Sequence, residues 1–145
     1  MKINLILFLF IVLNTSANTV EKKYDIICGT IPLSIGSCGK ECEYEYNHNE
    51  RILNITGKKM DDYKSPLEVP WYSQMERIVN ITFNEIEHIG ENSFNGAKSL
   101  TEIIIPSSVN SIGRNVFTNT NLNKIKYEGN KNLCVNNIKY ISKCY

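Results

Sequence analysis

The sequence has almost no excess of charge of either sign, few histidines and only one long hydrophobic run. It carries 16 lysines and arginines against 15 aspartates and glutamates. It has no basic stripe of the kind that neutralises phosphates, which argues against nucleic acid as a partner. The two histidines, His48 and His88, stand in no recognisable nucleophile or metal motif. We therefore predict a non-enzymatic protein with no catalytic residue, no cofactor and no metal site.

The hydrophobic run covers residues 3–13 and follows Lys2. A bilayer span needs about 20 apolar residues. This run is 11 residues long, is interrupted by Asn4 and precedes the small residues Thr15, Ser16 and Ala17, a pattern that predicts a secretory signal peptide at residues 1–17. Its cleavage removes Lys2 and leaves 15 basic and 15 acidic residues. Because residues 136–145 are too polar for a lipid-anchor signal, we expect a secreted, extracellular protein with no stable membrane insertion.

An internal repeat is the most informative feature that the sequence does contain. An Ile-Gly pair and a Phe recur after 23 residues, and a Leu and two strand positions recur after 22. A period in the 20s with fixed apolar offsets is typical of a stacked solenoid, in which each copy buries its apolar side against its neighbours. The predicted core positions are Ile89, Gly90, Phe94, Leu100, Ile103 and Ile105, and in the second copy Ile112, Gly113, Phe117, Leu122, Ile125 and Tyr127.

Residue types within a copy predict where its strand ends and how the chain turns. Pro106 lacks an N–H and should end the strand that contains Ile103 and Ile105. We expect Gly113 to adopt positive φ in a sharp turn, and Phe117 to return to the core between layers. A degenerate earlier copy, with Ile78, Ile81 and Phe83 in the strand positions, brings the stack to about three layers.

The segment from Ile103 to Gly113 resembles the repeat unit of the BspA-type leucine-rich repeat family. In that family, a leader module with a Cys-Gly, an aromatic alternating strand, a Met-containing turn and a Pro-Trp-Tyr often precedes the repeats. The matching features in this chain are Cys38-Gly39, Tyr44 and Tyr46, residues 52–57, residues 60–63 and Pro70-Trp71-Tyr72. The resemblance implies a mainly β, leucine-rich-repeat-like solenoid that interacts with proteins or glycans outside the cell.

Alternating residues in 43–46 and 51–57, joined by a turn-rich segment, predict a β-hairpin that covers the first layer. Trp71 and Tyr72 are expected to fill the junction between hairpin and stack, with a solvent-exposed aromatic pair that binds a sugar as the less favoured alternative. Asp61-Asp62 are expected to form a solvated turn. The predicted organisation is a signal peptide at 1–17, an N-terminal extension and hairpin cap at 18–76, a solenoid at 77–129 and a C-terminal cap at 130–145.

Five cysteines follow the signal peptide, and in a secreted chain their default role is disulfide bonding. We expect Cys134 to pair with Cys144 and to close the C-terminal cap. The pairing of Cys28, Cys38 and Cys42 stays open, and an odd cysteine would be free or would join a second chain. Zinc bound by Cys38, Cys42 and His48 is the less favoured alternative, because the spacing is not that of a standard zinc knuckle.

Strand alternation predicts a contact face on the outer side of the stack. With Ile103 and Ile105 inward, Glu102 and Ile104 point outward beside Lys124 and Lys126. We interpret these four residues as the binding site of an extracellular adhesion module. The rival functions are a soluble regulator or a structural coat component that associates with related repeat proteins, and a secreted enzyme. Two glycosylation sequons begin at Asn54 and Asn80, and the second should lie on the same face.

Overall fold

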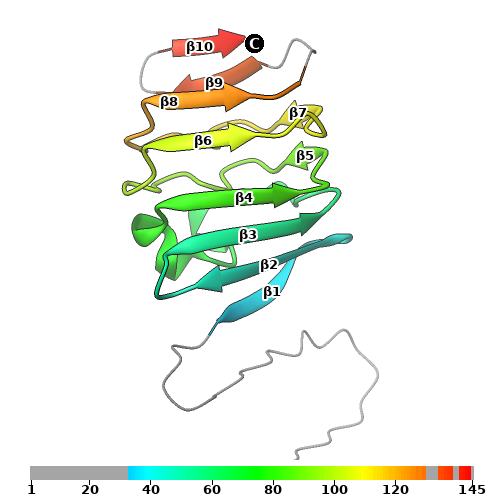
Figure 1. Cartoon of the computed structure of the whole chain (residues 1–145), viewed down its shortest axis with the longest axis vertical. Helices are drawn as coiled ribbons and strands as arrows, with labels where there is room; N and C mark the ends of the chain where they lie inside the picture. The colour runs from blue at the N-terminus through cyan, green and yellow to red at the C-terminus, as the bar shows by residue number, and fades with distance from the viewer. Residues whose placement is uncertain (1–32, 130–133, 139–140, 145) are drawn as a thin grey trace, which may run out of the picture.

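The computed structural model describes residues 33–129 and the backbone of two short C-terminal strands. It is a mainly β, elongated stack in which the strands follow one another along the long axis (Figure 1). The mainly β fold predicted from the sequence is therefore confirmed. The strands are β1 (Ser34–Gly39), β2 (Cys42–Asn47), β3 (Ile52–Gly57), β4 (Asn80–Asn84), β5 (His88–Ile89), β6 (Glu102–Ile105), β7 (Ser111–Ile112), β8 (Lys124–Tyr127), β9 (Cys134–Ile138) and β10 (Ile141–Cys144), and the 3-10 helices are η1 (Pro66–Glu68) and η2 (Tyr72–Arg77).

The N-terminal part is a four-stranded sheet in the order β1-β2-β3-β4. β2 and β3 form the expected antiparallel hairpin. β1 adds a third antiparallel strand, which the sequence analysis did not foresee. β3 then pairs in parallel with β4, with Leu53 opposite Ile81. The hairpin thus extends the sheet to β4 and pairs with one edge of that strand, which closes this edge to pairing with other chains.

The repeats pair in parallel through two separate ladders. β6 pairs with β8, with Glu102 opposite Lys124 and Ile105 opposite Tyr127. β5 pairs with β7, with Ile89 opposite Ile112. β6 ends at Ile105, directly before Pro106. Each copy therefore contributes one strand to the outer face and a two-residue strand on the other side of the turn (Figure 1).

A column of aromatic rings runs through the core. Trp71 and Phe94 are fully buried and stack with ring centroids 5.8 Å apart, and Phe94 stacks on Phe117 at 5.9 Å. The indole N–H of Trp71 donates to the backbone oxygen of Ser93, which satisfies the polar group of this buried side chain. Tyr72, which we had expected to pack beside Trp71, is instead 47% exposed because η2 turns it outward.

The glycines of the Ile-Gly pairs serve a different purpose from the one predicted. Positive φ was expected at Gly113, but the glycines with positive φ among the described residues are Gly39, Gly57 and Gly96. A Cβ on Gly113 would collide with the backbone of Glu91, and a Cβ on Gly90 would collide with the backbone oxygen of Asp61. These glycines are required because successive layers of backbone touch there.

The structure answers part of the question of which cysteines pair with each other. Cys38 and Cys42 form a disulfide that closes the turn between β1 and β2, and this bond is incompatible with zinc on the two sulfurs. The backbone register places Cys134 opposite Cys144, but their side chains lie outside the described residues, as do Cys28 and the predicted signal peptide at 1–17. Within the described part of the chain, no helix is long and apolar enough to cross a membrane.

Candidate functional site

The outer face of β6 and β8 carries the four residues predicted to bind a partner. Strand alternation buries Ile103 and Ile105 and leaves Glu102 and Ile104 exposed. The register places Lys124 beside Glu102 and Lys126 beside Ile104. We call the set Glu102, Ile104, Lys124 and Lys126 the strand ladder. Ile104 is 54% exposed and is one of three large hydrophobic side chains that stand open to solvent in the described part of the chain.

Ion pairs partly satisfy the charges of the strand ladder. The Lys124 ammonium lies 3.1 Å from a carboxylate oxygen of Glu102, and the Lys126 ammonium lies 2.9 Å from one of Glu128. All four side chains are largely exposed, so each pair contributes at most about 1 kcal/mol to stability. Pairs this weak are easily exchanged for contacts with a partner.

The two sequons continue the same surface toward the cap. β4 contacts β6 and leaves Asn80 and Thr82 exposed. Thr82 pairs with Asn54 across β3 and β4, and its hydroxyl donates to the side-chain oxygen of Asn54 at 2.6 Å. The side-chain oxygen of Asn80 accepts the backbone N–H of Ile81 at 2.8 Å. Both potential acceptor asparagines therefore lie on neighbouring strands near the strand ladder.

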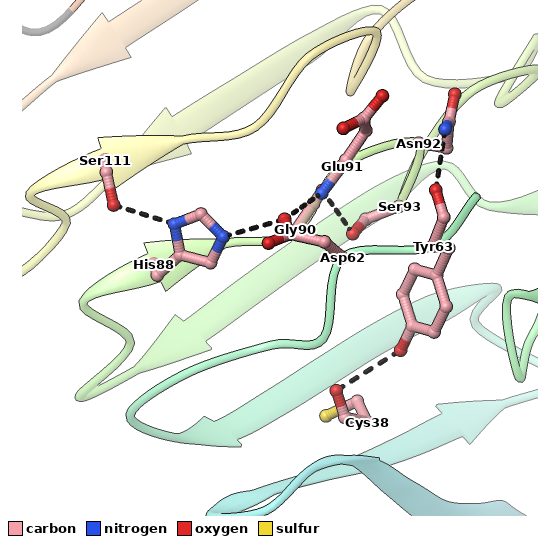
Figure 2. A network of polar contacts seen from close by, with 9 residues as sticks. All are labelled: Cys38, Asp62, Tyr63, His88, Gly90, Glu91, Asn92, Ser93 and Ser111. Carbon is pink, nitrogen blue, oxygen red and sulfur yellow. Dashed lines mark hydrogen bonds and ion pairs between the residues drawn. The ribbon is translucent and has the colours of Figure 1, made fainter. Parts of the chain in front are cut away.

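A polar cluster that the sequence analysis missed joins the cap to two repeats (Figure 2). Nε2 of His88 lies 3.0 Å from Asp62 Oδ1, and Nδ1 lies 2.7 Å from the hydroxyl of Ser111. The backbone N–H of Glu91 donates to the same Asp62 oxygen. We call Asp62, His88 and Ser111 the layer clasp. The one available signal was the repeat offset, which places position 88 opposite position 111.

The chemistry of the layer clasp fixes the hydrogen positions in neutral His88. An ionised carboxylate only accepts hydrogen bonds, so Nε2 carries the proton toward Asp62 and Nδ1 accepts from Ser111. Burial acts to raise the pKa of Asp62, but the Glu91 N–H bond and His88 outweigh burial and bring this pKa below its usual value. Asp62 is thus held ionised. Asp61 and Asp62 are both exposed, as expected for a solvated turn, but Asp62 also bonds to His88 and to the N–H of Glu91.

Two further bonds tie the same loop to its neighbours. The side-chain amide of Asn92 donates to the backbone oxygen of Tyr63 at 2.8 Å, and the Tyr63 hydroxyl donates to the backbone oxygen of Cys38 (Figure 2). Burial, followed by the nearby Asp61, raises the pKa of Tyr63 well above its ordinary value, so its hydroxyl remains a donor. These contacts connect the disulfide-closed turn of the cap to the first repeat.

The order Ser111, His88, Asp62 is that of a hydrolase triad, in which serine gives its proton to a histidine oriented by an aspartate. Such chemistry also needs backbone donors aimed at a developing oxyanion. Here the N–H of Ser111 bonds to Glu87 and that of Gly113 bonds to Ile89, both across the layers. Among the described residues, no group of three or more histidine, cysteine, aspartate or glutamate side chains could hold a metal ion. The three side chains link the loop that contains Asp62 to two successive repeats.

Comparison with known proteins places this architecture in a family. A search among curated proteins finds no match. A leucine-rich repeat protein from Eubacterium ventriosum, known from its crystal structure, aligns with a TM-score of 0.61 and 28% identity over 66% of this chain. The aligned region spans only 26% of that longer protein. The profile described as "BspA type Leucine rich repeat region (6 copies)" matches residues 69–143. The chain therefore belongs to the BspA-type leucine-rich repeat family.

Proposed function

We propose that this protein is a secreted extracellular binding or adhesion module that recognises a protein or glycan through the strand ladder. The signal peptide expected at residues 1–17 would direct it out of the cell, and the caps expected at 18–76 and 130–145 would flank the solenoid at 77–129. Membership in a repeat family supports an interaction role, because stacked repeats present extended surfaces for binding.

The observation that carries the proposal is the exposed Ile104 between charged neighbours on the outer face of β6 and β8. An apolar side chain surrounded by Glu102, Lys124 and Lys126 gives a partner both a hydrophobic contact and charges that steer association. The weak ion pairs of this surface leave it free to exchange partners.

Glycosylation decides between two versions of this function. If Asn80 is unmodified, the strand ladder binds; if Asn80 carries a glycan, the sugar stands over the ladder and binding moves to the loops at residues 113–121. We would purify the chain from a secreting eukaryotic host and measure occupancy of Asn54 and Asn80 by mass spectrometry. Binding to a panel of cell surfaces would then be compared for the parent and the K124E/K126E variant.

The expected result is an unoccupied Asn80 and at least a tenfold loss of binding on charge reversal, because two attractive charges become repulsive. K40E/K64E is the matched control, since both lysines are exposed and lie outside the strand ladder. Equal binding by all three proteins in the absence of a glycan at Asn80 would show that the ladder is not the site.

The odd number of cysteines favours a second candidate function, that of a coat component which associates with related repeat proteins. With Cys38 bonded to Cys42 and Cys134 expected to pair with Cys144, Cys28 would be available to a second chain. Non-reducing electrophoresis of the secreted protein tests this. A dimer that disappears on reduction, and in the C28S variant, would support the coat role, whereas a monomer under all conditions would exclude this covalent route.

The layer clasp gives the enzyme alternative a specific test. We propose that Ser111 is not a nucleophile, because its neighbouring backbone donors are used between layers. A fluorophosphonate probe should therefore leave Ser111 unmodified under conditions that label trypsin completely. Labelling that disappears in both S111A and H88A would establish the opposite.

A further inference from the structure

A second surface, away from the strand ladder, has the chemistry of a small binding site. A shallow hollow of about 690 Å³ lies between η2 and the turns that follow the repeat phenylalanines. Its wall combines an aromatic ring, two amides and three charged groups. These groups belong to six of the lining residues, Tyr72, Glu76, Arg77, Asn95, Lys98 and Asn119.

The aromatic side of the hollow is provided by Tyr72. Trp71 is fully buried, whereas Tyr72 is 47% exposed although it is the next residue. A tyrosine ring offers an apolar face together with a hydroxyl that can donate and accept. The core does not use this ring, so it is available to a ligand.

The amides of the hollow are oriented by a chain of hydrogen bonds. Asn119 donates to the side-chain oxygen of Asn95 at 3.0 Å, Asn95 donates to that of Asn92, and Asn92 donates to the backbone oxygen of Tyr63. Because this chain starts at a fixed backbone oxygen, each amide has a defined orientation. Each link uses one of the two N–H groups of an amide, so a second N–H remains at both Asn95 and Asn119.

Charged groups complete the wall. The Lys98 ammonium lies 2.6 Å from a carboxylate oxygen of Glu76. The hydrogen bond and the charge of Glu76 raise the pKa of Lys98, which keeps the ammonium protonated. The pair is neutral as a whole and presents a donor beside an acceptor. Arg77 adds further donors at the rim.

We propose that this hollow binds one uncharged saccharide ring of a glycan. The apolar C–H face of the ring would lie on Tyr72, and its hydroxyls, which both donate and accept, would meet Asn95, Asn119 and the Glu76–Lys98 pair. An apolar peptide side chain fits less well, because it would leave these amides and charges desolvated without partners. The hollow is separate from the strand ladder, so this proposal can be tested independently of the proposed function.

The test is a titration of the purified chain, followed by NMR, with maltotriose, mannotriose, lactose and N,N′-diacetylchitobiose. We expect saturation by at least one probe with a dissociation constant on the order of 1 mM, as is usual for a shallow site and a ligand of this size. Y72A should weaken that binding by about tenfold, and N119A by about threefold. Y72F should retain most of the affinity, since the ring remains.

Two controls distinguish saccharide binding in the hollow from nonspecific binding and from binding at the strand ladder. Leu67 is 68% exposed on the neighbouring η1 and does not line the hollow, so L67A should bind the saccharide as the parent does. K124E/K126E should also bind normally. The proposal is overturned if no probe saturates the parent, or if Y72A binds as tightly as L67A.

Discussion

Single residues explain why the layers of this stack can approach one another so closely. Gly90 and Gly113 occupy equivalent positions, and at each of them a side chain would collide with the backbone of the preceding layer. Nearby, Asn92 and Asn115 adopt positive φ, a conformation that asparagine tolerates better than most residues. Sequence alone suggested the importance of both glycines but assigned the wrong cause, because a repeat pattern does not reveal which backbone atoms lie across the layer boundary.

The first prediction concerns Gly113. G113A should lower the free energy of unfolding by about 1–3 kcal/mol, because Cβ must displace the Glu91 backbone. Urea unfolding followed by circular dichroism measures this change. S107A alters an exposed side chain and should stay within about 0.5 kcal/mol of the parent. A G113A protein as stable as S107A would mean that the layers are not in contact here.

The second prediction concerns the pH dependence given by Asp62. Its pKa is lowered in the folded chain from the model-peptide value of 3.8, so the ionised form stabilises the fold. That contribution is fully present above about pH 4 and is lost as the pH falls through the lower, folded-state pKa. In D62N, the melting temperature should therefore depend less on pH below about 4 than in the parent. Melting temperatures of the parent, D62N and the exposed control E50Q would be measured across this pH range. If the melting temperatures of D62N and the parent fall equally with pH, the role assigned to Asp62 is wrong.

At the scale of elements, stability depends on rings that stack between repeats. Phe94 and Phe117 are buried and nearly parallel, at an interplanar angle of 19°. The strands that flank them pair with the register expected from the repeat, because a fixed period places equivalent residues opposite each other. The sequence analysis did not predict β1 because apolar and polar residues alternate only weakly in Ser34–Gly39. Its partner strand and the Cys38–Cys42 bond hold it in the sheet.

The third prediction tests the ring column. F94A and F117A should each cost about 3–5 kcal/mol in unfolding free energy, the usual range for a buried phenylalanine. Y72A provides a matched aromatic truncation at an exposed position and should cost about 0.5 kcal/mol or less. Thermal and urea melts of the three variants decide the matter. Equal stability of F117A and Y72A would show that the two copies are not equivalent in packing.

The fourth prediction concerns the last two strands. Cys134 and Cys144 are opposite each other in the register of β9 and β10, and we expect a disulfide between them in the secreted protein. Peptide mapping without reduction should recover the two cysteines as one linked fragment. Recovery of either residue as a free thiol, or linked to Cys28, would contradict the predicted closure of the C-terminal cap.

At the scale of the whole molecule, the N-terminal sheet, the repeats and the C-terminal strands form one elongated stack (Figure 1). The strand ladder and the hollow beside Tyr72 lie at separate places on it. The strand ladder was predictable because alternation and period together fix which residues share a face. The layer clasp and the hollow beside Tyr72 were not, since they depend on where the loop at residues 58–65 and the helix η2 pack against the repeats. Contacts of this kind join residues far apart in sequence and leave no local pattern.

The most direct test of the account compares two exposed apolar side chains, Ile104 on the strand ladder and Leu67 away from it. The measurement is binding of the purified I104D and L67D variants to the cell surfaces that bind the parent chain, followed by flow cytometry. An aspartate at the centre of a contact would be buried without a partner, so I104D should lose at least tenfold in affinity while L67D binds as the parent does. If I104D binds as well as L67D, the strand ladder is not the contact face, and the proposed function fails.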